Sequence, residues 1–186
     1  SCSLYENGNL KVNTHLKHSN KSGHELFKEY FLGKYSIVPL TVCFRKKIVN
    51  EYVDDEFCIE NQLSTIDKFI FPEMMIHTKF HFINQITGHY RILSSSISNT
   101  NDFFKCQQWY YKGKIVLDYF MTRYPMDKHL QKKVYNRYYI SSIDFGLKNK
   151  NYFFTKRNAI YLSFIDMKSL LYYFLGKQPI LYFIFS

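Results

Sequence analysis

Three side chains with acid–base or cationic chemistry stand at every second position of one segment: His77, Lys79 and His81. Alternate residues of a β-strand point to the same face, so neighbours in this set would lie roughly 7 Å apart on one face. Two imidazoles and an ammonium can cleave RNA without a metal, with one histidine as base, the other as acid, and lysine stabilising the phosphorane charge. The competing interpretation is the solvated face of a half-buried strand.

Metal ligation is the third interpretation of the same segment. His77 and His81 have His-x₃-His spacing, and Glu73 is the best nearby carboxylate. Metal sites in proteins usually have three or four protein ligands, and nothing local completes this set. The sequence therefore predicts neither a metal nor a cofactor, and it contains no P-loop, dinucleotide-binding glycine pattern or nucleophile elbow.

A second candidate site combines basic side chains with aromatic rings. Basic groups that follow phosphates, together with rings that stack on bases, favour binding of RNA or another single-stranded nucleic acid, a role that would suit a component of a ribonucleoprotein assembly. Buried rings and solubilising turn lysines are the alternative explanation. Similar residues occur at Phe153, Lys156 and Arg157, but the assigned binding residues are Arg91, Trp109, Tyr111, Lys112, Lys114, Lys132, Lys133, Lys148 and Lys150.

The net charge of +10 favours association with RNA, DNA or acidic lipid. Composition weakens this argument, because Ala159 is the only alanine and lysine greatly outnumbers arginine, as AT-rich coding would produce. The one acidic stretch, Asp54, Asp55 and Glu56, is either a solvated loop or a binding surface for a basic protein partner. Position along the chain is therefore more informative than abundance.

The elements expected to position these residues are mostly strands. Asn7-Gly8 predicts a hairpin turn within residues 4–10. Helices are expected at 23–32, which Gly33 can close, and at 167–175, which Asp166 can cap. The predicted strands are 35–49, 70–83, 89–98, 103–111, 115–123, 134–145, 152–164 and 180–185, with a tight turn at 111–114.

Together these elements predict a mainly β, α+β fold: a curled antiparallel sheet or partly closed barrel, built on a meander, with two short helices. A barrel that encloses an apolar ligand among its aromatic side chains is accordingly the third functional hypothesis. At 186 residues the chain is expected to form a single domain over residues 1–186.

The cysteines and the apolar runs limit the class of protein further. Cys2, Cys43, Cys58 and Cys106 are widely spaced, so they predict no zinc ribbon, and they permit either free thiols or two disulfides. No run approaches the roughly 20 apolar residues of a transmembrane helix. The sequence therefore predicts no membrane-spanning segment.

Overall fold

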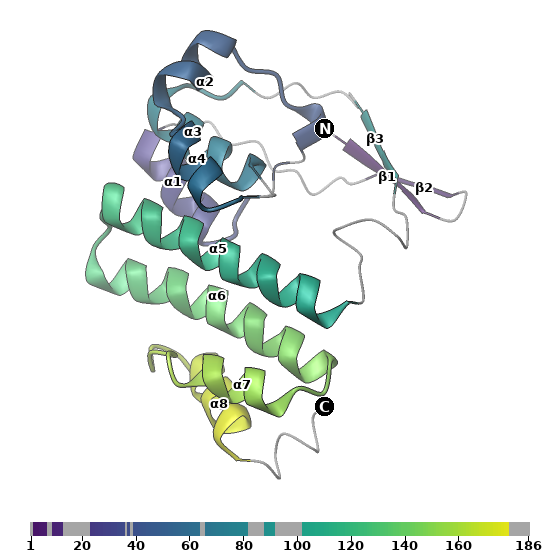
Figure 1. Ribbon diagram of the computed structural model, residues 1–186, viewed down its shortest axis with the longest axis vertical. Helices are drawn as coiled ribbons and strands as arrows, with labels where there is room; N and C mark the ends of the chain where they lie inside the picture. Colours follow the sequence, from purple (N-terminus) through teal and green to yellow (C-terminus); the bar gives the residue numbers. More distant parts are fainter. Residues whose placement is uncertain are drawn as a thin grey trace. The chain divides into compact units, whose positions relative to one another are not determined.

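A computed structural model describes residues 2–6, 9–12, 23–35, 37, 39–63, 66–81, 88–91 and 102–178 (Figure 1). The chain divides into two compact units, residues 1–116 and 117–186, and each is described separately below. The expectation of a single domain stays a prediction.

The prediction of a mainly β fold is wrong, because the described residues form eight α-helices and only three short strands. Helices occupy all or most of five predicted strands: 70–83, 103–111, 115–123, 134–145 and 152–164. Residues 35–49 contain a 3₁₀ turn and the start of a helix instead of a strand. The curled sheet, the meander and the barrel are therefore absent from the described residues, and the predicted strand 180–185 lies outside them.

The first unit contains most of the shorter elements. They are α1 (Gly23–Phe31), the 3₁₀ helix η1 (Pro39–Thr41), α2 (Lys46–Tyr52), α3 (Asp55–Glu60), α4 (Asp67–His77) and the beginning of α5 (Phe103–Arg123). Helix α1 packs against α4, as α2 also does. Phe27 of α1 and Phe69, Met74 and Met75 of α4 are among the most deeply buried side chains. The prediction of a helix at 23–32 is confirmed by α1.

The strands form one small sheet in the order β2-β1-β3. β1 (Cys2–Glu6) and β2 (Asn9–Val12) are antiparallel, and Glu6 lies opposite Asn9. The predicted N-terminal hairpin is therefore confirmed. β3 (Gly88–Arg91) overlaps the predicted strand 89–98 but runs parallel to β1, contrary to the expected antiparallel arrangement.

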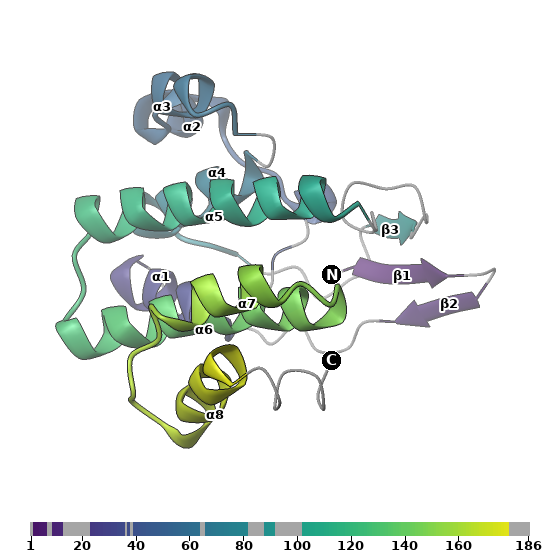
Figure 2. The same ribbon diagram turned by 60° about the horizontal axis from the view of Figure 1, so that its bottom comes forward.

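The second unit is built from the end of α5, α6 (Lys128–Lys148), α7 (Tyr152–Ala159) and α8 (Met167–Lys177). Helix α7 packs against both α6 and α8, as Figure 2 shows. Apolar side chains from the three helices and the loop after α7 form its core: Ile140, Ile143, Leu147, Ala159, Leu162 and Leu175. Within the described residues, no helix has the length and apolar character needed to cross a bilayer.

Residues without bulky side chains allow α7 to approach its neighbours closely. A Cβ atom added at Gly146 of α6 would collide with Oγ1 of Thr155, and one added at Gly176 of α8 would collide with Cβ of Ala159. Thr155 and Ala159 are four residues apart in α7, so they lie on one face. The only alanine of the chain is therefore a contact point between two helices.

Polar contacts fix the ends of these helices. Asp166 accepts a hydrogen bond from the Ser169 amide at 2.7 Å, completing a capping box that confirms the predicted start of α8. Asn136 of α6 binds the loop between α7 and α8 twice, donating to the Ser163 carbonyl at 2.6 Å and accepting from its amide at 2.8 Å. The two contacts hold the loop against α6.

The helical period of the buried residues explains why the predicted strands were wrong. In α5 the buried residues Val116, Leu117, Phe120 and Met121 have the spacing of one helix face. The Lys-Gly-Lys sequence read as a turn lies in the middle of this helix. A glycine inside a helix costs only about 1 kcal/mol relative to alanine, which burial of one such face outweighs.

Exchanging the methyl group between Ala159 and Gly176 tests the contact of α7 with α8. We expect Gly176→Ala to lower the free energy of unfolding by about 1–3 kcal/mol, because the added methyl overpacks the interface. The double variant Ala159→Gly/Gly176→Ala should be more stable than Gly176→Ala alone, measured by urea unfolding. Additive losses in this double-mutant cycle would contradict the contact.

Removal of the Asp166 cap of α8 should lower the free energy of unfolding by an amount that depends on pH. The hydrogen bond from the Ser169 amide is the largest cause that holds the pKa of Asp166 below its ordinary value. The ionised carboxylate therefore stabilises the folded protein at pH values above the pKa that Asp166 has in the unfolded chain. This stabilisation is lost as pH falls through the pKa that Asp166 has in the folded protein. Asp166→Ala should therefore cost about 1 kcal/mol near neutral pH, whereas Asp166→Asn retains most of the cap. Urea unfolding at about pH 7 and about pH 3.5 should show that Asp166→Ala lowers the free energy of unfolding less in acid. An equal loss at both pH values would refute the contribution of the carboxylate charge.

Candidate nucleic-acid interface

His77, Lys79 and His81 do not share a strand face. His77 is the last residue of α4, and the other two are exposed in the segment that follows it. The prediction of a strand at 70–83, on which the ribonuclease arrangement depended, is wrong because residues 70–77 belong to α4, a helix that is buried almost all round from Phe71 to Met75. The catalytic roles themselves stay a prediction that has lost its geometric argument.

His77 instead belongs to a local cluster at the end of α4. Its ring stacks on Tyr52 of α2, with centroids 4.0 Å apart and planes 6° apart. Its Nε2 lies 3.5 Å from Oε2 of Glu73, one helical turn earlier and fully buried. Through these contacts, His77 links α2 to α4.

The described residues contain no group of three or more His, Cys, Asp or Glu side chains placed to hold a metal. Three cysteines among them are free thiols: Cys43 is exposed, Cys58 is buried and Cys106 is half-buried. The side chain of Cys2 lies outside the description. Asp54 caps α3 by accepting from the Phe57 amide at 2.9 Å, and Asp55 and Glu56 lie in its first turn. A basic protein partner for this acidic stretch stays a prediction.

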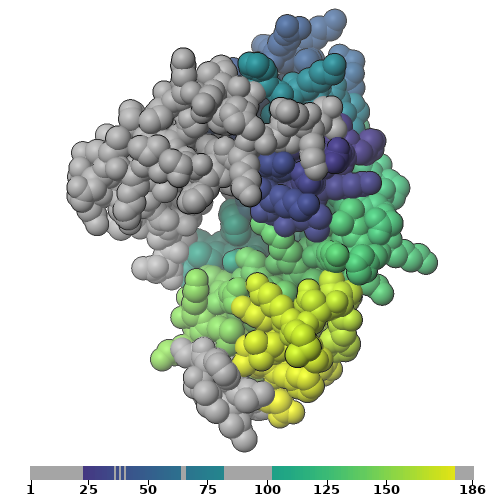
Figure 3. Space-filling view, turned by 180° about the vertical axis from the view of Figure 1, so that it is seen from behind, coloured from purple at the N-terminus to yellow at the C-terminus, as the bar shows by residue number. Residues whose placement is uncertain are grey.

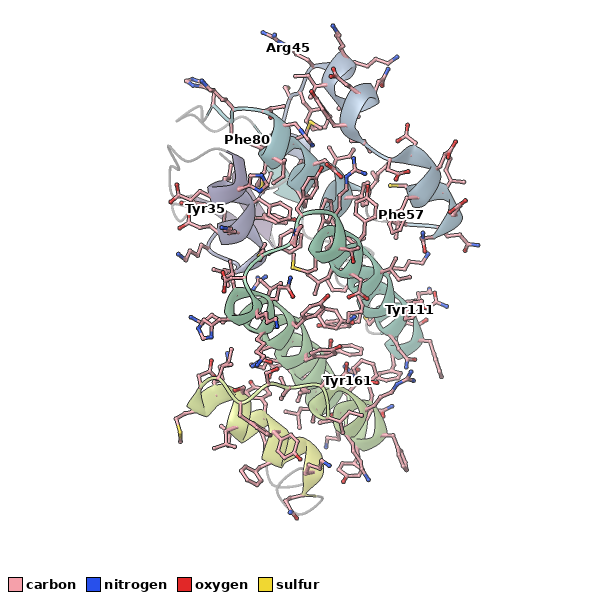
Figure 4. All side chains as sticks on the ribbon, turned by 90° about the vertical axis from the view of Figure 1, so that its left-hand side faces the viewer. Tyr35, Arg45, Phe57, Phe80, Tyr111 and Tyr161 are labelled. Carbon is pink, nitrogen blue, oxygen red and sulfur yellow. The ribbon has the colours of Figure 1, made fainter. Side chains whose placement is uncertain are left out.

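The four predicted binding residues at 109–114 lie along α5, not at a hairpin tip. The Nζ atom of Lys68 lies over the ring of Trp109, 3.1 Å from its centroid. The lysine therefore covers part of the indole face. Lys112 donates a hydrogen bond to the Gln62 carbonyl. Tyr111 is exposed, as Figure 4 shows, and Lys114 is half-buried. The expected hairpin surface is therefore absent, and the side chain of Arg91 in β3 lies outside the description.

The four predicted lysines of α6 and its C-terminal turn fall into two groups. Lys132 and Lys133 lie near the start of the helix, whereas Lys148 is its last residue and Lys150 follows it. With a rise of 1.5 Å per residue, about 24 Å separates Lys132 from Lys148 along the axis. The two pairs therefore cannot form one compact patch along this helix.

Every acidic side chain of the second unit accepts a hydrogen bond from another residue of the same unit. Asp127 caps α6 by accepting from the Leu130 amide at 2.9 Å, and Asp166 caps α8. Asp118 accepts from the Tyr135 hydroxyl at 2.9 Å, and Asp144 from the Tyr172 hydroxyl. These four aspartates are the only acidic residues of the unit, against eleven lysines and arginines, which gives a formal +7.

The tyrosine donors of these pairs remain protonated across the neutral pH range. Burial, followed by the hydrogen bond to Asp144, raises the pKa of Tyr172 to about 12. Burial and Asp118 raise the pKa of Tyr135 further, and burial raises that of Tyr139 to about 12. Tyr139 also stacks on Tyr161, with ring centroids 5.3 Å apart; Tyr161 is labelled in Figure 4. The tyrosine hydroxyls therefore act as stable donors to the two carboxylates.

A group of exposed cations lies where α6 ends and α7 begins. We call it the α6–α7 corner and define it by Lys148, Lys150, Phe153, Lys156 and Arg157. All five side chains are exposed, and Phe153 is 83% exposed. No acidic residue occurs between 145 and 165. Phe153, Lys156 and Arg157 have i, i+3, i+4 spacing, so one helix face carries a ring and two cations.

The sequence interpretation named Phe153, Lys156 and Arg157 among the basic and aromatic residues but did not assign them to the binding site, and it treated residues 152–164 as a strand. In a strand, residues 153 and 156 point to opposite faces, whereas in a helix they share one. The signal that would have grouped them was Asn151, which caps α7 by accepting from the Phe154 amide at 2.9 Å. Asparagine followed by a helix-compatible run is a recognised helix start.

Comparison with protein-family models, with curated proteins and with solved structures gave no match. The geometry and charge of the described residues are therefore the basis for a functional proposal.

The reactivity of two cysteines should follow their environments. Burial, aided by Asp55 and Asp54, raises the pKa of Cys58 to about 11, whereas Cys43 is exposed. The thiolate is the reactive form, so Cys58 should react with a disulfide reagent only when the protein unfolds. Cys43→Ser should remove the fast component of the native reaction and Cys58→Ser should not; the reverse result would contradict the burial of Cys58.

Proposed function

We propose that the protein binds single-stranded nucleic acid and that the α6–α7 corner makes the contact. The observation that carries the proposal is the corner itself: residues 148–157 carry four exposed cations and a phenylalanine that is 83% exposed, on a stretch without acidic residues. Cations that follow phosphates and a ring that stacks on a base are the two components of such binding.

The electrostatic part of the proposal depends on where the acidic residues are. The aspartates of the second unit accept hydrogen bonds from helix amides and tyrosine hydroxyls. Cations that neutralise phosphates release counterions, so each contact adds to the salt dependence of binding. The formal +7 of this unit supports attraction of a polyanion.

The stacking part depends on the orientation of α7. Thr155 and Ala159 are buried against Gly146 and Gly176, which fixes the face that α7 turns toward its neighbours. Phe153 and Lys156 lie outside that buried face and are exposed. The Nζ atom of Lys156 lies 6.0 Å from the ring centroid of Tyr152, one turn away. The ring of Phe153 is therefore presented to solvent by a rigid helix, which supports stacking on a base.

Binding of fluorescent single-stranded oligonucleotides, measured by anisotropy over a salt series, tests the proposal. The affinity of the full chain should fall steeply from low to moderate salt. Lys156→Gln/Arg157→Gln should reduce the slope of log K against log salt by about 1.4, since each lost contact removes about 0.7. Phe153→Ala should weaken binding by about 1–3 kcal/mol with little change in slope.

Matched control variants come from the first unit. Lys46→Gln/Lys47→Gln removes an adjacent pair of exposed cations from α2, and Phe104→Ala removes a ring that is 74% exposed. Neither control should change the affinity as strongly as its counterpart in the corner. No binding at low salt, or equal effects of corner and control variants, would refute the assignment.

A further inference from the structure

A narrow apolar stripe runs along the exposed side of α8. Met167, Leu171 and Phe174 are 80%, 53% and 45% exposed. At 100° per residue, their i, i+4, i+7 spacing confines them to an arc of about 60°. Figure 3, in which α8 is yellow, shows the helix at the molecular surface. We call these three residues the α8 stripe.

The two lysines of α8 lie on opposite sides of the stripe. Helical geometry places Lys168 about 100° to one side of Met167 and Lys177 about 80° to the other. Their Nζ atoms lie 5.8 Å from the ring centroid of Tyr172 and 5.4 Å from that of Tyr173. An apolar stripe with a lysine at each edge is the pattern of a helix that lies in the interface of a membrane, because lysine stems extend beside apolar groups while the ammonium stays at the headgroups.

The orientation of the stripe is fixed by the other side of the helix. Ser169 and Gly176, on the face opposite the stripe, are buried, with Gly176 against Ala159 and Ser169 in the capping box with Asp166. Rotation of α8 to hide the stripe would break both contacts. The exposure of the stripe is therefore a consequence of the packing of the second unit.

We propose that the α8 stripe docks on an anionic lipid bilayer. Met167, Leu171 and Phe174 enter the boundary between headgroups and acyl chains, with Lys168 and Lys177 at the lipid phosphates and the helix lying in the membrane plane. Charge complementarity selects this occupant: the unit carries a formal +7, and α8 contains no acidic residue from Met167 to Lys177. A second copy would instead bring like charges together at every edge of the stripe. The inference uses a different helix face from the α6–α7 corner and does not rest on nucleic-acid binding.

Flotation of the full chain with vesicles tests this proposal. The chain should bind vesicles of phosphatidylcholine with about one quarter phosphatidylserine and bind phosphatidylcholine vesicles at least tenfold more weakly. Leu171→Glu should reduce the partition coefficient about tenfold or more, and Met167→Ser, at the most exposed position of the stripe, should reduce it several-fold. Lys168→Ser/Lys177→Ser should diminish the preference for phosphatidylserine.

Ile59→Glu is the matched control, because Ile59 is 74% exposed in the first unit, and it should bind vesicles like the unaltered chain. Leu171→Glu should retain its melting temperature and its affinity for oligonucleotides, which separates this proposal from the one on the corner. The proposal is overturned if the full chain does not bind phosphatidylserine vesicles, or if Leu171→Glu and Met167→Ser bind them normally. It is also overturned if the chain forms a dimer that Leu171→Glu dissociates.

Discussion

The close approach of α7 to both α6 and α8 is the constraint on which the second unit depends. It requires the absence of a Cβ atom at Gly146 and at Gly176, where Thr155 and Ala159 occupy the space. Interiors at this packing density leave no room for even one added methyl group without a shift of the backbone. The same contacts fix the rotation of two helices, so they determine that Phe153 faces solvent on one and Leu171 on the other.

Parts of the fold were predictable where the signal was local and independent of composition. Asn7-Gly8 indicated the first hairpin, and Asp166 indicated the start of α8. The strands were predicted from the alternation of apolar and polar residues at 70–83 and from runs of β-branched and aromatic residues between turn signals, residue types that favour strands because they fit a pleated surface. Phe, Tyr and Ile are abundant throughout this chain, so their presence does not distinguish strand from helix. The buried positions Asn136, Ile140, Ile143 and Leu147 show the helical period that abundance concealed.

The candidate site was predictable only in part for the same reason. Lys148 and Lys150 were assigned to the binding surface from the sequence and lie in the corner. Phe153 and Lys156 could not be grouped with them under a strand interpretation, because that geometry separates them. Conversely, the apparent grouping of His77 with Lys79 existed only in a strand, and α4 removed it. Residue types were thus informative, whereas their grouping depended entirely on the correct secondary structure.

The internal use of the four aspartates of the second unit has a consequence for how its sequence can change. Two cap helices and two accept from tyrosines, so the acidic residues are part of the scaffold. Exposed lysines such as Lys132 and Lys156 make no comparable contribution to helix capping. Substitutions at these lysines can therefore alter the electrostatic field of the unit while its architecture persists. Over evolutionary time, the charge of this surface can be adjusted in small steps without a corresponding loss of stability.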